Sequence, residues 1–280
     1  MKHKINSALI FVLMSVSILG QMPDIQWKEG PLTCKLGKNI ANVDIDENYL
    51  FLDSRNTRDF MESIGNPTSG AELGTILPGY EGSDGWFILF EYDNIGYVSD
   101  DDKYDIDADA ILRNIKKGTE SANKKRTKDG FSPLIIKGWY NRPYYDDKTN
   151  NLTWAILAET DGEPVVNHNI RFLGRSGVMS VALVTNPNEL DDAIRETKPI
   201  LSTFSYSQGK RYFEFVEGDK IAGYGLTALI AGGAGAAAAK LGLFAKLWKF
   251  ILKLWYLVVA AIIAVFNVIK KFFSKTVKGE

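Results

Sequence analysis

The sequence has 280 residues, 45% of them hydrophobic, which suits one large globular domain or two small ones. Its net charge of −1 divides into +2 over residues 1–20, −10 over residues 21–220 and +7 over residues 221–280. The acidic central part argues against a nucleic-acid partner, because such a partner needs a basic face. The single cysteine, Cys34, excludes an intrachain disulfide.

Residues 1–20 follow the plan of a secretory signal peptide. Lys2 and Lys4 precede an uncharged apolar run from Ala8 to Leu19, and Gly20 follows it. As a helix the run would be about 18 Å long, short of a bilayer core of about 30 Å. We therefore expect export, with Gly20 as the candidate cleavage position, and whether the peptide is cleaved stays open. The alternative is a buried N-terminal helix.

Periodicity in residues 21–220 predicts an extracytoplasmic α+β domain. Residues 42–53 alternate like a strand pair, and a short helix is expected from Ser54 to just before Gly65. Residues 85–98 read as two short strands. Residues 107–128 have one apolar face, typical of an amphipathic helix. Four further strand-like runs then precede a helix that we expect Asn188 to cap and Pro199 to bend; the runs are LIIKGWYNRPYY, NLTWAILAE, VVNHNIRFLG and GVMSVALVT.

Hairpin-linked strands and few helices predict a mostly antiparallel sheet with helices packed on it. That order of elements is similar to the small PsbP/Mog1-type sandwich fold. Because one fold hosts many functions, this similarity predicts no activity.

The most charged segment is DDDKYDIDADA, residues 100–110. Asp105, Asp107 and Asp109 are spaced like the start of a calcium-binding loop. The pattern then fails, since Ala110 replaces the turn glycine and Lys116 takes the place of the twelfth-position glutamate. We favour the alternative, in which these acids cap the helix that follows. We expect neither a metal nor a cofactor.

The sequence offers no catalytic constellation. His168 is the only histidine outside residues 1–20, and it lies in a strand-like run without a second metal ligand at the right spacing. The segment LGRSGV (residues 173–178) lacks the lysine and the following helix of a phosphate loop, so a hairpin turn is expected. Cys34 has no base nearby. Aromatic residues could line a carbohydrate or peptide groove, although we favour core packing; they are Trp86, Trp139, Trp154, Tyr140, Tyr144 and Tyr145.

Residues 221–280 are predicted to anchor the chain to a bilayer. Residues 221–239 are free of charge and long enough to span as a helix. Residues 240–253 read as an amphipathic interfacial helix, and residues 254–269 as a second hydrophobic segment, so one or two crossings are open. The residues expected to serve the anchor are Gly232, Gly233, Lys246, Lys249, Lys253, Trp248 and Trp255.

Several blocks of sequence resemble a bacterial family of predicted membrane-anchored proteins, a domain of unknown function. The resemblance covers the chain from Leu36 to the C-terminus. It implies an envelope protein with a signal peptide, an extracytoplasmic domain and a C-terminal anchor, and it implies no catalytic residue, substrate or cofactor. The blocks are GWFILFEYDNIGYVSDDD, GWY…P…YD…LTWA, NIRFLGRSGVMSVALV, the expected strand QGKRYFEF and DKIAGYGLTALIAGGAGA.

These features together predict a non-catalytic binding or interaction module at the cell membrane, with its main domain outside the cytoplasm (periplasmic if the cell is Gram-negative). Its partners would be the lipid bilayer and a protein of the envelope, with the oligomeric state open. Two alternatives remain. One is a divalent-cation-dependent hydrolase or transferase that uses the aspartate cluster, and the other is a structural membrane protein that oligomerises through its tail.

Overall fold

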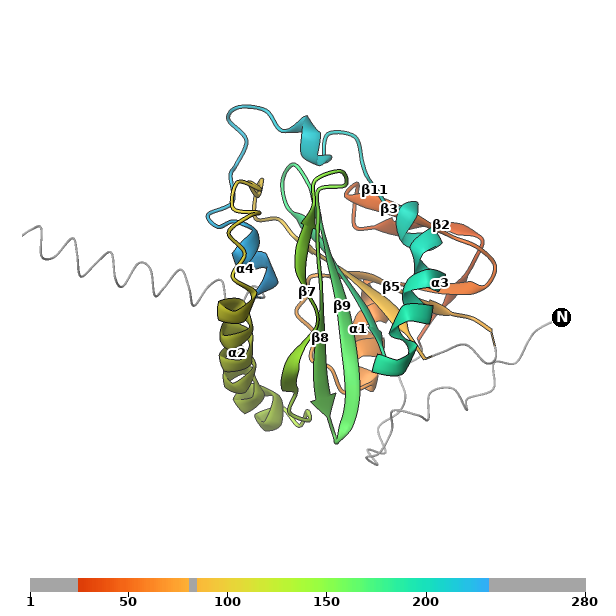
Figure 1. The fold of residues 1–280 in the computed structure, drawn as a ribbon. Helices are drawn as coiled ribbons and strands as arrows, with labels where there is room; N and C mark the ends of the chain where they lie inside the picture. The colour runs from red at the N-terminus through yellow and green to blue at the C-terminus, as the bar shows by residue number, and fades with distance from the viewer. Residues whose placement is uncertain (1–24, 81–84, 232–280) are drawn as a thin grey trace, which may run out of the picture. The chain divides into compact units, whose positions relative to one another are not determined.

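The computed structural model describes residues 25–80 and 85–231. An eight-stranded antiparallel sheet dominates this part of the chain (Figure 1). Its strands, in spatial order, are β1 (Lys28–Glu29), β4 (Tyr49–Asp53), β5 (Glu72–Pro78), β6 (Phe87–Asp93), β10 (Val178–Thr185), β9 (Glu163–Leu173), β8 (Asn151–Thr160) and β7 (Ile135–Asp146). A second sheet has three strands, β11 (Ser205–Tyr206), β3 (Ala41–Ile45) and β2 (Leu32–Leu36).

One face of the large sheet packs against the small sheet and helix α3 (Leu190–Ser202). Side chains alternate along each strand, so every second residue of β6 and β10 enters this first core. The large sheet contributes Ile88, Phe90, Met179, Val181 and Leu183, the small sheet Cys34, Leu36 and Val43, and α3 Leu190, Ala193 and Ile200.

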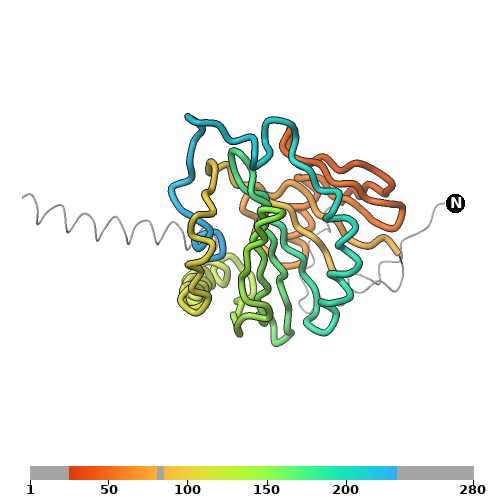
Figure 2. Tube along the Cα trace, turned by 45° about the horizontal axis from the view of Figure 1, so that its top comes forward, coloured from red at the N-terminus to blue at the C-terminus, as the bar shows by residue number. Residues whose placement is uncertain are grey.

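The opposite face carries α1 (Ser54–Ser63), α2 (Ala108–Lys128) and the short helix α4 (Leu226–Ile230). Phe60 of α1 contacts Phe87 of β6 edge to face, at a ring distance of 5.5 Å. In Figure 2, α2 and α4 lie side by side on one flank of the green strands, with α3 and the small sheet on the other. The second core joins α2 and α4 to the sheet through Ile111, Ile115, Leu152, Trp154, Leu226 and Leu229.

The expected α+β class with a mostly antiparallel sheet is confirmed. The four strand-like runs form β7 to β10. The hairpin turn expected at LGRSGV joins β9 to β10, where Gly174 N donates to Gly177 O. At the start of α1, Asp53 accepts a hydrogen bond from Asn56 N, so the cap lies one residue before the expected first residue.

Three local predictions were wrong. Asn188 does not cap a helix, because it lies within the 3₁₀ turn η2 (Pro187–Glu189), and α3 then runs past Pro199 to Ser202. The expected strand QGKRYFEF forms the 3₁₀ turn η3 (Tyr212–Glu214) instead. The second strand expected within residues 85–98 is a single parallel bridge between Tyr97 and Ile221. The two 3₁₀ turns are closed by local hydrogen bonds, from Glu189 N to Asn186 O and from Glu214 N to Arg211 O. The bridge between Tyr97 and Ile221, in contrast, joins residues distant in the sequence.

The structure also differs from the expected membrane span over its first eleven residues. Ile221 pairs with Tyr97, and α4 has only five residues, of which Leu226 is fully buried against the domain. The side chains of Leu226, Leu229 and Ile230 enter the second core and those of Ala222 and Tyr224 pack against it, whereas Ile221 is exposed. Residues 222–230 therefore pack as part of the folded domain.

The remaining predicted anchor lies outside the described residues, as does the predicted signal peptide. This applies to Gly232, Gly233, Lys246, Lys249, Lys253, Trp248 and Trp255. Within residues 25–80 and 85–231, we found no helix with both the length and the apolar character needed to cross a membrane.

Candidate functional site

The three aspartates considered as calcium ligands have separate surroundings. The Oδ1 atom of Asp107 accepts hydrogen bonds from Asp109 N (3.1 Å) and Ala110 N (2.9 Å), which caps α2. The carboxylate of Asp109 forms an ion pair with Arg142 of β7, and Asp105 is exposed. The capping interpretation is therefore confirmed for Asp107. Among the described residues, no group of three His, Cys, Asp or Glu side chains could hold a metal ion.

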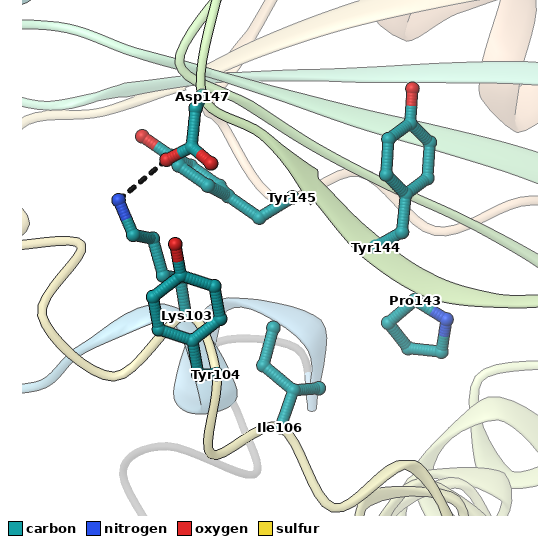
Figure 3. Close-up of a pocket in the computed structure, with 7 residues that line it drawn as sticks. All are labelled: Lys103, Tyr104, Ile106, Pro143, Tyr144, Tyr145 and Asp147. Carbon is teal, nitrogen blue, oxygen red and sulfur yellow. Dashed lines mark hydrogen bonds and ion pairs between the residues drawn. The ribbon is translucent and has the colours of Figure 1, made fainter.

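A cavity of about 330 Å³ lies where the loop before α2 meets the end of β7 (Figure 3). Its volume is at the lower end of the range for small-ligand pockets. Figure 3 shows the Lys103 side chain directed toward Asp147, with Pro143 and Tyr144 apart from it on the β7 side. The lining residues are Lys103, Tyr104, Ile106, Pro143, Tyr144, Tyr145 and Asp147.

The irregular pairing of β7 with β8 explains why tyrosines reach this cavity. The register shifts at three places along β7, the last of them between Asn141 and Tyr144. Such shifts bend a strand and redirect its side chains. Pro143 has no N–H group to donate, which suits an edge strand. Tyr144, which follows the last of these shifts, is 58% exposed. On the facing loop, Tyr104 is 84% exposed.

The ammonium group of Lys103 lies among acids and aromatic rings. Its Nζ atom is 2.5 Å from Asp147 Oδ1 and 3.7 Å from Asp100 Oδ2. The same atom is 5.4 Å from the centre of the Tyr104 ring and 5.8 Å from that of Tyr145, within the range of cation–π contacts. The hydrogen bond to Asp147 raises the pKa of Lys103, so the amine is fully protonated at neutral pH.

The wall of the cavity also contains the hydrogen-bonded phenol of Tyr145. The hydroxyl of Tyr145 accepts a hydrogen bond from Asn150 Nδ2 at 3.0 Å, and burial raises the pKa of this phenol. The neighbouring loop adds negative charge, because residues 100–109 include six aspartates and one lysine. The cavity thus combines aromatic faces with a negative rim.

The cavity loop is also bonded to the last described helix. Asp102 Oδ1 accepts a hydrogen bond from Leu226 N (3.0 Å), and Asp102 Oδ2 accepts one from Thr227 N (3.3 Å). Gly225 leaves room for this contact, since a Cβ atom there would lie 2.6 Å from Asp102 Oδ2. The loop that lines the cavity therefore holds the segment from which the C-terminal tail continues.

A row of mostly polar residues crosses the face of the large sheet that carries α2 and α4, and it ends at the cavity. Cross-strand pairs link Glu72, Glu91, Ser180, Arg171 and Leu152 in turn, and Leu152 pairs with Tyr145 in the cavity. The guanidinium carbon of Arg171 is 4.7 Å from the centre of the Trp154 ring. Burial lowers the pKa of Arg171 to about 10, so it stays charged at neutral pH.

The other two reactive side chains named from the sequence do not enter the cavity. His168 of β9 lies between Ala155 of β8 and Leu183 of β10, its cross-strand partners, and so faces the first core. Burial lowers the pKa of His168, and its buried Nδ1 atom has no hydrogen-bond partner among the described residues. Cys34 is fully buried, and burial raises the pKa of its thiol to about 12. A protonated, buried thiol is a poor nucleophile.

The aromatic residues named from the sequence divide between core and surface. Trp86 and Trp154 are 3% and 2% exposed, as core packing predicts, and half-buried Trp139 donates its Nε1 hydrogen to Ala108 O. Tyr140 and Tyr144 are exposed. Sequence reasoning missed the pair of Lys103 and Asp147, because these residues are 44 positions apart and meet only where the loop before α2 packs against the end of β7.

Comparison with known proteins assigns the chain to a family and finds one remotely similar solved structure. The chain is similar to the solution structure of cyanobacterial PsbP (CyanoP) from Synechocystis sp. PCC 6803, with 11% sequence identity and a TM-score of 0.36 over 69% of this chain and 98% of that chain. That likeness is too low to establish a shared fold, so the PsbP/Mog1-type sandwich stays a prediction. No curated protein matches the chain. A family model matches residues 28–263, and the chain therefore belongs to the family described as "Protein of unknown function (DUF2167)".

Proposed function

We propose that the protein is a membrane-anchored, extracytoplasmic binding module without catalytic activity, and that the cavity at Tyr104 and Tyr144 is its ligand site. The observation that supports this most directly is the exposure of both tyrosines around a cavity whose loop is bonded to α4. Exposed tyrosines are common in binding sites because they bury a large area with little loss of side-chain freedom.

The burial of α4 changes how the anchor would be built. If residues up to Ala231 belong to the domain, the uncharged residues 232–239 number eight and would form a helix of only about 12 Å. Residues 254–269 number sixteen and would reach about 24 Å, so they become the better crossing. Residues 240–253 would then lie in the outer interface, with their lysines extended toward lipid headgroups.

This arrangement predicts the topology of the tail. A single crossing by residues 254–269 puts four lysines in the cytoplasm (Lys270, Lys271, Lys275 and Lys278) and leaves four outside (Lys240, Lys246, Lys249 and Lys253). The lysine count is therefore equal on the two sides, and the direction of the crossing follows from the proposed extracytoplasmic position of the domain. Reporter fusions after Ala231 and after Lys253 should both read outside, and a fusion after Lys278 should read inside. A fusion after Ala231 that reads inside would contradict the proposal.

Partner binding at the cavity can be tested in the cell envelope. A photo-cross-linking amino acid replaces Tyr144 in one variant and Val216 in a matched control, since both side chains are exposed and Val216 does not line the cavity. We expect a cross-linked product from position 144 that is absent from position 216. Identical products from both positions would show that the cavity has no special role in binding.

A further inference from the structure

The position of Lys103 indicates what kind of ligand the cavity accepts. Its ammonium group contacts two carboxylates, Asp100 and Asp147, and two aromatic rings, Tyr104 and Tyr145. Carboxylates and ring faces are the two partners that best stabilise an organic cation at a protein surface. Lys103 therefore occupies a position already suited to an ammonium group.

We propose that this cavity binds a primary ammonium group on an alkyl chain, and that Lys103 is a built-in competitor for the same position. This proposal rests on the proposed function in taking the cavity as the ligand site. Lys103 is on a loop and has a flexible four-carbon side chain, so its ammonium group can leave the carboxylates for solvent. The ligand's alkyl chain would then lie in the free volume between Ile106 and Pro143.

Charge around the cavity favours a cation over other ligands. The six aspartates within residues 100–109 outnumber the one lysine, and Asp147 adds a further carboxylate that is 56% exposed. A cleft with one sign of charge concentrates ligands of the opposite sign. An anionic ligand would be repelled. A neutral sugar could stack on the tyrosines but would make no use of the two carboxylates.

The geometry also predicts how removal of the competitor changes affinity. If the Lys103 ammonium group occupies the site between the two carboxylates about nine-tenths of the time, the site is free in about one-tenth of the molecules. The apparent Kd of the ligand is then about ten times its intrinsic value. The variant Lys103→Met removes the ammonium group and its charge and keeps an unbranched side chain that is one heavy atom shorter. It should therefore bind an alkyl diamine about ten times more tightly than the unmodified chain.

The test is calorimetric titration of the full chain in detergent. One titration uses 1,5-diaminopentane and a second uses a short lysine peptide, so that binding of a free amine is distinguished from binding of a lysine side chain in a peptide. Lys103→Met should strengthen binding of at least one of them about tenfold. Asp147→Asn should weaken it at least tenfold. Glu163→Gln removes an equal charge at the far end of β8 and β9 and should have little effect.

Three outcomes would overturn the proposal. They are unchanged binding in Lys103→Met, equal weakening by Glu163→Gln and Asp147→Asn, and binding of a neutral disaccharide in place of the diamine. The last result would leave the cavity as a ligand site and so would reject only the ammonium ligand. Identical cross-linked products from positions 144 and 216, together with no binding of any of these ligands, would in contrast reject the proposed function itself.

Discussion

The hydroxyl group of Ser69 lies between two carboxyl groups and has a single hydrogen to donate. Its Oγ atom is 2.9 Å from Oε1 of Glu72 and 2.9 Å from Oε1 of Glu91. Burial disfavours the charged form of Glu72, but hydrogen bonds from Ser69 N and Gly70 N outweigh burial and lower its pKa. Burial raises the pKa of Glu91. Both contacts of Ser69 are satisfied when Glu91 carries a proton and donates it to Ser69 Oγ.

The raised pKa of Glu91 gives the stability a pH dependence of known sign. A carboxyl whose pKa is higher in the folded than in the unfolded state binds more protons when folded, so this contribution is present at low pH and is lost as pH rises through the folded-state pKa. Glu91→Gln keeps a donor for Ser69 and removes the titration. We expect urea midpoints of this variant to fall less between pH 5 and pH 8 than those of the unmodified chain. Parallel pH profiles for both proteins would contradict the assignment.

Single residues could be predicted from the sequence where their partners are local. The cap at Asp107 was recognisable because a cap bonds to the next two or three residues of the same helix. The contact of Lys103 with Asp147 depends on how the loop before α2 meets the end of β7, and that of Ser69 with Glu91 depends on the pairing of β5 with β6. The alternation of apolar residues specifies which face of a strand is buried. It does not show the irregular pairing between Glu72 and Gly74 that accompanies the second contact.

At the scale of elements, α2 tests the capping interpretation against the metal one. Asp107→Ala should lower the unfolding free energy by about 1 kcal/mol because it leaves the first turn of α2 without an acceptor. Asp107→Asn should retain most of that stability, and Asp105→Ala should cost much less. Thermal melts with and without calcium are the measurement. A calcium-dependent rise in melting temperature that Asp105→Ala abolishes would favour metal binding.

Helices and strands whose apolar residues recur at a regular spacing were predictable, because an element with one buried face needs an apolar residue each time that face recurs along the chain. This holds for α1, α2 and β7 to β10. The failures are short elements without a period of their own. Tyr97 and Ile221 pair with each other across 124 residues, and α4 has too few residues to show a helical repeat.

At the scale of the whole molecule, α4 defines where the domain ends. A chain of residues 21–231 keeps the buried side chains of Leu226, Leu229 and Ile230, whereas a chain of residues 21–220 lacks them. Burial of each such side chain contributes about 1.5–3 kcal/mol. We expect the shorter chain to melt at a clearly lower temperature or to remain unfolded. Equal melting temperatures would show that α4 adds nothing to the domain.

The attachment of α4 has a mechanical consequence. Tyr97 N donates to Lys220 O, Ala222 N donates to Tyr97 O, and the two carboxylate oxygens of Asp102 hold the start of the helix. A pulling force applied beyond Ala231 therefore meets these hydrogen bonds and the buried face of α4 before it reaches the sheet. The first part to yield under load would be α4, and its release would free the loop beside Lys103 while the eight-stranded sheet stays intact.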